Sequence, residues 1–167
     1  CKKRGVSSIM KLDTIVISDF LDNPDMVRQS LIDNEVEFPI TGNFPGRRTA
    51  LADDGYQEMF INKLRELLPF DIDVNYDSSS FSFQLCLDGE ETWAHLDEYQ
   101  WTGVLYLTPD PNPDSGTLVL DPDSSMVTTL IANVYNRLVL FRGGTYPHRS
   151  NVAGFGDCLE NGRLKQV

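Results

Sequence analysis

The chain has 167 residues, of which 41% are hydrophobic, and its formal net charge at pH 7 is −11. This hydrophobic content is sufficient for a folded core and excludes a disordered chain, while the length favours one domain. The acidic balance argues against binding to nucleic acid or to an anionic membrane through surface charge.

The three cysteines, Cys1, Cys86 and Cys158, are far apart and odd in number, which is not the pattern of a disulfide framework. They favour a reducing, cytoplasmic setting. No apolar run approaches the roughly 20 residues of a membrane-spanning helix, and the N-terminus lacks the pattern of a signal peptide. The last residues, GRLKQV, resemble the start of a strand and leave open whether the natural chain continues past Val167.

The first elements in chain order are a short strand and a helix. The run DTIVISDF, residues 13–20, has the composition of a strand. Asn23, Pro24 and Asp25 then predict the start of a helix, as N-cap, first helical residue and acid of the first turn.

A second helix is predicted from about Asp54, and Pro69 ends it. The residues of its predicted stripe fall at three- and four-residue steps: Tyr56, Phe60, Lys63, Leu64 and Leu67. Between the two helices, the segment TGNFPGRRT, residues 41–49, is predicted to be a loop because of its glycine and proline content.

The second half consists of short runs rich in β-branched and aromatic residues, separated by turn segments. These runs are FSFQLCL, WTGVLYLT, GTLVL, MVTTLIA and NRLVLF. They predict an antiparallel sandwich or barrel. We therefore expect an α+β, mainly β fold with N-terminal helices packed on one sheet. It would be a single domain over residues 1–167, with a helical layer at about 1–75 and a β-core at about 76–167.

The two histidines of the chain, His95 and His148, lie in the segments WAHLDEYQW and GGTYPHRS. On a strand, residues two apart point to the same side, so His95 and Asp97 share a face and Leu96 is expected to turn into the core. His148 follows a strand and a turn, and would complete the two-histidine, one-carboxylate set that holds iron in non-haem Fe(II) oxygenases. We predict that His95, Asp97 and His148 are the metal ligands and the catalytic centre.

The ordered motifs from Phe81 to Val167 resemble the 2-oxoglutarate- and Fe(II)-dependent dioxygenases, most closely their prolyl-hydroxylase-like branch and its small bacterial and phage members. The resemblance rests on the HLD motif, the strands GVLYLTPD and GTLVL, and NRLVLFRGGTYPHR. It implies a double-stranded β-helix, or jelly roll, with the metal in the open mouth between two sheets.

The resemblance also implies a cation for the distal carboxylate of 2-oxoglutarate, on the strand after the second histidine. The sequence departs from the family here. The residue at the position where the family commonly has this cation, after His148, is Cys158. Arg163 is our first choice and Lys165, on the same face, is the second. Arg149 and Arg142 are weaker candidates, since alternation turns Arg149 away from the face of His148.

Two further residues are candidates for the cosubstrate site. Tyr106 matches a family position at which a tyrosine hydroxyl meets the distal carboxylate, although an ordinary strand aromatic is an equal alternative. Gln84 interrupts an apolar strand and either lines the mouth near the cosubstrate or lies on a solvated face. A rim of four aromatic residues could shield a substrate or could simply pack: Trp93, Tyr99, Trp101 and Tyr146.

The adjacent Arg47 and Arg48 could meet an anionic substrate or form ion pairs with the acidic surface, which is the commoner case. The resemblance implies hydroxylation of an unactivated C–H bond in a peptidyl or small-molecule substrate. Fe(II), 2-oxoglutarate and dioxygen would be used, ascorbate could act as a reductant, and succinate and carbon dioxide would be released. Asp97 favours hydroxylation, because related halogenases leave its coordination position to chloride.

Two alternatives to this function remain. One is a cupin-type metal-dependent β-barrel, although cupins usually have more than two histidines. The other is a non-catalytic metal-binding β-barrel module, which a missing ligand would have favoured, and no ligand is missing. The sequence does not reveal the primary substrate or the oligomeric state.

Overall fold

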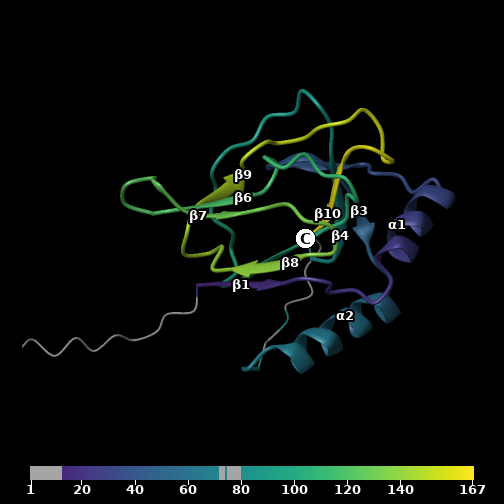
Figure 1. The fold of residues 1–167 in the computed structure, drawn as a ribbon, viewed down its shortest axis with the longest axis horizontal. Helices are drawn as coiled ribbons and strands as arrows, with labels where there is room; N and C mark the ends of the chain where they lie inside the picture. The colour runs from purple at the N-terminus through teal and green to yellow at the C-terminus, as the bar shows by residue number, and fades with distance from the viewer. Residues whose placement is uncertain (1–12, 72–73, 75–79) are drawn as a thin grey trace, which may run out of the picture.

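Two antiparallel sheets and two helices make up the computed structural model, which describes residues 13–71, 74 and 80–167 (Figure 1). In spatial order, the seven strands of the larger sheet are β1 (Thr14–Ile17), β8 (Leu138–Phe141), β5 (Thr102–Tyr106), β10 (Arg163–Gln166), β4 (Ser82–Cys86), β3 (Phe44–Leu51) and β2 (Ile40–Gly42). The smaller sheet contains β7 (Val127–Ile131), β6 (Thr117–Leu120) and β9 (His148–Ser150) in that order. The mainly β, antiparallel prediction is confirmed.

Alternation along the strands of the larger sheet produces two apolar layers. On β5, Val104 and Tyr106 face the smaller sheet, and they pack in one buried cluster with Val119 of β6. The intervening Leu105 joins a second cluster on the opposite face, which contains Phe60 of the helical layer. The core therefore has the arrangement of a sandwich, with the helices on the outer face of one sheet as predicted.

The helix α1 (Pro24–Asp33) begins as the sequence indicates. The Asn23 side chain accepts a hydrogen bond from the Met26 amide at 3.1 Å, and Pro24 occupies the first helical position. This cap satisfies one of the backbone donors that a helix start leaves unpaired.

The helix α2 (Asp54–Leu67) also matches the predicted range, but its buried face is rotated from the predicted stripe. Phe60 and Leu64 are buried as expected, together with Ile61, whereas Leu67 is 49% exposed. The apolar contact continues instead through Leu68, which follows the helix and is buried.

The prediction of a loop at residues 41–49 is wrong, because most of β2 and most of β3 lie in this segment and form a hairpin at the edge of the larger sheet. The glycine that suggested a loop has a structural reason. Gly46 has a positive φ of 73°, and a Cβ there would lie 2.2 Å from the Leu85 carbonyl oxygen. A glycine is therefore what lets β3 approach β4 at this point. Together with β1, the hairpin gives the N-terminal half three strands besides its helices.

No helix within the described ranges is long and apolar enough to cross a membrane.

Replacing Gly46 by alanine should destabilise the protein more than the same change at Gly89. Both glycines have positive φ, but nothing lies within 4 Å of a Cβ at Gly89. Gly89→Ala should therefore cost only the left-handed conformation, about 1–2 kcal/mol. Gly46→Ala should cost more, because the backbone of β4 must also move. Urea unfolding measures both losses, and equal losses would contradict the role given to the close approach.

Candidate metal centre

The two histidines are brought together by backbone hydrogen bonds. His95 lies in the segment between β4 and β5, and it forms an isolated antiparallel bridge with His148, the first residue of β9. The His95 amide donates to the His148 carbonyl at 3.1 Å, and the His148 amide donates to the His95 carbonyl at 2.9 Å. The bridge places both imidazoles on one side of the chain pair, with ring centroids 4.4 Å apart.

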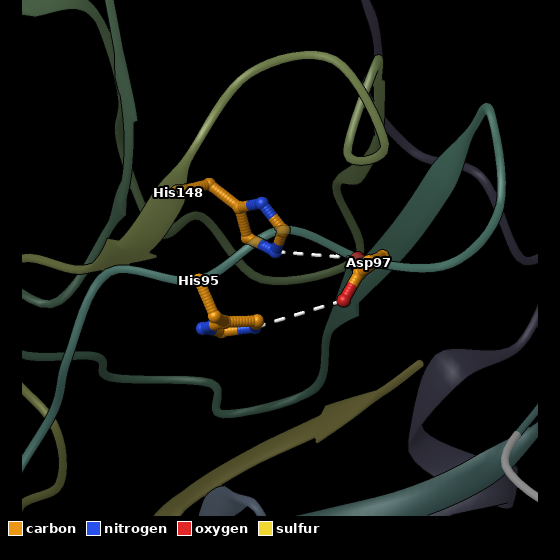
Figure 2. Close-up of side chains that lie close together, drawn as sticks. All are labelled: His95, Asp97 and His148. Carbon is orange, nitrogen blue, oxygen red and sulfur yellow. Dashed lines mark ion pairs between the residues drawn. The ribbon is translucent and has the colours of Figure 1, made fainter. Parts of the chain in front are cut away.

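Asp97 completes a set of three converging donor groups (Figure 2). Its Oδ1 lies 3.7 Å from the Nε2 of His95, and its Oδ2 lies 3.3 Å from the Nε2 of His148. One ligand atom from each residue lies within 4.8 Å of the others. The expected convergence of His95 and Asp97 is therefore found, and His148 meets them.

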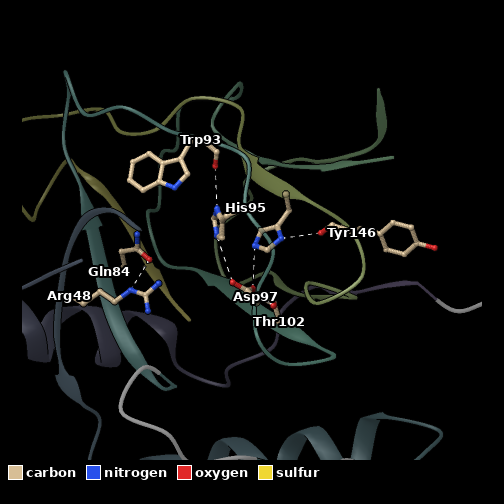
Figure 3. Close-up of polar contacts among 8 residues, drawn as sticks. Arg48, Gln84, Trp93, His95, Asp97, Thr102 and Tyr146 are labelled. Atoms are coloured by element: carbon tan, nitrogen blue, oxygen red, sulfur yellow. Dashed lines mark hydrogen bonds and ion pairs between the residues drawn. The ribbon is translucent and has the colours of Figure 1, made fainter. Parts of the chain in front are cut away.

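The other nitrogen of each ring is held by the backbone two residues earlier (Figure 3). The Nδ1 of His95 lies 3.2 Å from the Trp93 carbonyl oxygen, and the Nδ1 of His148 lies 3.3 Å from that of Tyr146. A carbonyl only accepts, so these contacts are hydrogen bonds when Nδ1 carries the proton. When the proton is on Nδ1 alone, Nε2 carries the lone pair, which is the form of imidazole that binds a metal.

The charges of the site also suit a metal. Burial would raise the pKa of Asp97, but hydrogen bonds from His148 and Thr102 lower it to about 2, so the carboxylate is ionised near neutral pH. Burial and the neighbouring His148 lower the pKa of His95, which favours its neutral form. An ionised carboxylate and a neutral imidazole are the protonation states that a metal requires of its ligands.

Two features that the sequence did not reveal support Asp97. The Thr102 hydroxyl, at the start of β5, donates to Asp97 Oδ2. The turn after β8 packs against the same loop, because a Cβ at Gly143 would lie 2.0 Å from Thr102 Oγ1 and one at Gly144 would lie 2.4 Å from the Tyr99 carbonyl oxygen. The glycine pair close before the second histidine was a signal for this packing, whereas nothing in the pattern singled out Thr102.

The prediction that Leu96 turns into the core is wrong, since its side chain is 55% exposed. His95 is a single bridge residue, and the residues after it leave the sheet. Within the described residues no strand covers Leu96, which is among the residues that line the cavity beside His95, Asp97 and His148.

A cavity of about 560 Å³ opens beside these three side chains, and its volume is within the size range of small-molecule sites. Gln84 and Lys165 of the larger sheet line it, and both are buried. Tyr106 is fully buried, and its hydroxyl lies 2.6 Å from Oγ1 of Thr117, which also lines the cavity. The burial of Gln84 excludes the alternative that it lies on a solvated face.

Arg163 does not line this cavity, although it is completely buried and on the same face of β10 as Lys165. Its Nε donates to the Ser115 carbonyl at 3.1 Å, and its Nη1 donates to Ser150 Oγ at 2.7 Å and to the Ala153 carbonyl at 3.2 Å. Its Nη2 is buried without a hydrogen-bond partner among the described residues. Most of the guanidinium is thus used to hold the end of the sandwich.

The remaining candidates have separate positions. Arg149 lines the cavity, and its Nη1 donates to the Ser150 carbonyl at 3.4 Å. Arg142 lies outside it, with its guanidinium carbon 4.4 Å from the centroid of the Trp101 ring. Among the four aromatic rim candidates, Tyr99 and Trp101 line the cavity, whereas Trp93 and Tyr146 do not.

No protein-family model matches the sequence, and no curated protein matches it. Solved structures do. A prolyl-4-hydroxylase from Pseudomonas putida matches with a TM-score of 0.58 and 19% identity, over 92% of this chain and 89% of that one. A prolyl hydroxylase from Trichoplax adhaerens, solved with a hypoxia inducible factor oxygen degradation domain peptide fragment, matches with a TM-score of 0.61 and 16% identity, over 92% and 80%. The fold is therefore similar to that of prolyl hydroxylases.

Proposed function

We propose that residues 1–167 form one domain of a 2-oxoglutarate-dependent Fe(II) dioxygenase, which hydroxylates a C–H bond of a peptidyl or small-molecule substrate. One observation carries this proposal: His95, Asp97 and His148 converge at a cavity, in a fold similar to that of prolyl hydroxylases. In the balanced reaction, one oxygen atom of O₂ enters the substrate as a hydroxyl group. The other enters succinate as 2-oxoglutarate loses carbon dioxide.

The strand order supports a jelly roll as the architecture behind this site. The bridge between His95 and His148 adds the His95 segment to the edge of the smaller sheet, next to β9. The smaller sheet then has four members, and its β6 and β7 share a buried cluster with β5 and β8 of the larger sheet. Two facing four-membered antiparallel sheets are the arrangement expected of a double-stranded β-helix.

The donor set fits Fe(II), because two imidazole nitrogens and one carboxylate are the ligands that non-haem iron oxygenases use. Bound Fe(II), with 2-oxoglutarate and dioxygen, would supply the oxidising chemistry. His95 and His148 would bind through Nε2, and Asp97 through its carboxylate. The carbonyls of Trp93 and Tyr146 would hold both rings in the correct tautomer, and Thr102 would orient the carboxylate.

The cosubstrate's distal carboxylate would lie at the cationic part of the cavity, beside Lys165, with Arg163 behind it. Lys165 lines the cavity, whereas Arg163 lies outside it with one nitrogen, Nη2, that has no hydrogen-bond partner among the described residues. Lys165 and Tyr106 are register partners on β10 and β5, but Tyr106 does not line the cavity, and its hydroxyl is paired with Oγ1 of Thr117, which does. Burial raises the pKa of Tyr106, which keeps this hydroxyl protonated.

The first test is to add Fe(II) and then 2-oxoglutarate to the metal-free protein without oxygen and to record the visible spectrum. We expect a metal-to-ligand charge-transfer band that is lost in His148→Ala, because one of three ligands is removed. Metal binding without the band would point to a cupin-type enzyme. No metal binding would leave a non-catalytic β-barrel module.

Thr102→Val should weaken Fe(II) binding by about tenfold or more, since the residues that orient metal ligands contribute about 10- to 100-fold to affinity. The valine keeps the shape of the side chain and removes the hydroxyl that donates to Asp97. Thr128→Val is a matched control, because the Thr128 hydroxyl donates to the Val119 carbonyl and lies outside the cavity. Equal Fe(II) affinity in both variants would contradict the role of Thr102.

Lys165→Met should change both the affinity for the cosubstrate and the pH dependence of stability. Loss of the cation should weaken 2-oxoglutarate binding by roughly tenfold or more, the size of a hydrogen bond to a charged group. Burial, and then the charge of Arg163, lower the pKa of Lys165 from 10.5 to about 7. Between these two pKa values the unfolded chain keeps the Lys165 proton, whereas the folded protein has lost it. The free energy of unfolding should therefore rise with pH across this window.

That rise should be absent from Lys165→Met, and urea unfolding at several pH values measures it in the metal-free protein. Calorimetry of the Fe(II)-loaded protein without oxygen measures the affinity for 2-oxoglutarate. If the variant binds 2-oxoglutarate as tightly as the wild type, the distal carboxylate does not bind at Lys165.

A further inference from the structure

The imidazole of His148 is more enclosed than that of His95. The His148 side chain is 7% exposed, and that of His95 is 27% exposed. The contact between Nδ1 of His148 and the Tyr146 carbonyl oxygen is 3.3 Å long, slightly beyond the usual range of an N–H···O hydrogen bond. A weak hydrogen bond leaves a ring free to turn about its χ2 angle unless other side chains pack against it.

Phe141, the last residue of β8, packs against this ring. The two ring centroids are 4.7 Å apart and the ring planes meet at 64°, close to the edge-to-face arrangement that aromatic pairs favour. Phe141 is completely buried, in one cluster with Val104 of β5 and Val139 of β8. Because a close-packed core side chain has little freedom to change its rotamer, Phe141 forms a fixed wall beside His148.

The strand partner of Phe141 supports Asp97. Phe141 is opposite Thr102, the first residue of β5, in the antiparallel register. Residues directly opposite each other place their side chains on the same face of a sheet. The Thr102 hydroxyl donates to Asp97 (Figure 3), and the Phe141 ring contacts His148. One cross-strand pair therefore contacts two of the three proposed ligands.

His95 does not share this support. Within the described part of the chain, its ring contact is with His148, and its Nδ1 lies 3.2 Å from the carbonyl oxygen of Trp93, a residue that is 38% exposed. Its Nε2 is 3.7 Å from Asp97, compared with 3.3 Å for His148. The larger sheet thus contacts His148 and Asp97 directly, whereas His95 depends on its bridge to β9.

We infer that Phe141 is a positioning residue of the metal centre, which holds the His148 ring so that its Nε2 faces Asp97. With its strand partner Thr102, it preorganises one half of the donor set before a metal binds. A ligand that is already oriented loses less conformational freedom on binding, so the metal is bound more tightly. The inference rests on the proposed function, because that function makes His148 and Asp97 metal ligands.

The test compares removal of the Phe141 ring with a cavity made elsewhere in the same cluster. Phe141→Leu and Phe141→Ile keep a buried aliphatic side chain and remove the ring. Ile131→Ala is the control, because Ile131 of β7 belongs to the same buried cluster and does not line the cavity. Urea unfolding measures the stability of each metal-free variant, and titration without oxygen measures its affinity for Co(II) and Fe(II). Co(II) also gives a visible spectrum that depends on the coordination geometry.

Both Phe141 variants should bind Co(II) and Fe(II) more weakly by roughly three- to tenfold, the equivalent of one aromatic contact. Their Co(II) spectra should differ from that of the wild type, because the His148 ring is no longer held in one orientation. Ile131→Ala should lower the free energy of unfolding at least as much, because it leaves an unfilled cavity in the core. It should nevertheless keep the affinity and the spectrum of the wild type.

Two results would overturn the inference. In the first, the Phe141 variants bind Co(II) with the affinity and the spectrum of the wild type, which would reduce Phe141 to a core side chain. In the second, Ile131→Ala weakens metal binding as much as ring removal does, so that general loosening of the core explains the loss. Failure of the wild type to bind either metal would instead refute the proposed function, so the two failures are distinguishable.

Discussion

The centre depends on one pair of backbone hydrogen bonds, those between His95 and His148. Because the amide and carbonyl of each histidine bond to the other, the spacing of the two rings is set by strand geometry and not by side-chain packing. The antiparallel pairing also gives the two residues equivalent surroundings. Each ring bonds the carbonyl two residues earlier in its own segment, and each directs Nε2 to Asp97. A single bridge thus positions both imidazoles, and only the carboxylate of Asp97 needs other contacts to orient it.

The buried cations are the costly part of the site. A cation removed from water without a partner destabilises a fold, and a protein can lower the cost by shifting the pKa of the group or by binding an anion. Arg163 avoids most of the cost through three hydrogen bonds to its surroundings. Lys165 instead shows a pKa lowered by burial. Such a residue contributes little to the free protein, and its presence is understandable if an anion binds there.

The sequence was most informative where a short pattern determines geometry. Residues two apart share a face of an extended chain, so the convergence of His95 and Asp97 could be predicted, as could the strands of the second half. Prediction failed where a residue's environment depends on distant segments. In the part of the chain that the structure describes, no strand covers Leu96, and hydrogen-bond partners from other segments surround Arg163. Thr102 carries no sequence signal for its bond to Asp97.

In the edge hairpin, Gly46 makes the sequence resemble a loop and also allows β3 to pair with β4. The glycine and proline content of residues 41–49 indicates a loop, yet the positive φ of Gly46 lets β3 lie directly against β4. That pairing puts Arg48 beside Gln84 and leaves Arg47 at the surface. His148 lies on β9, at one end of the smaller sheet, and His95 pairs with it through an isolated bridge. The hairpin belongs to the other sheet, so a change of side chain on β3 leaves the backbone bridge between the two histidines in place.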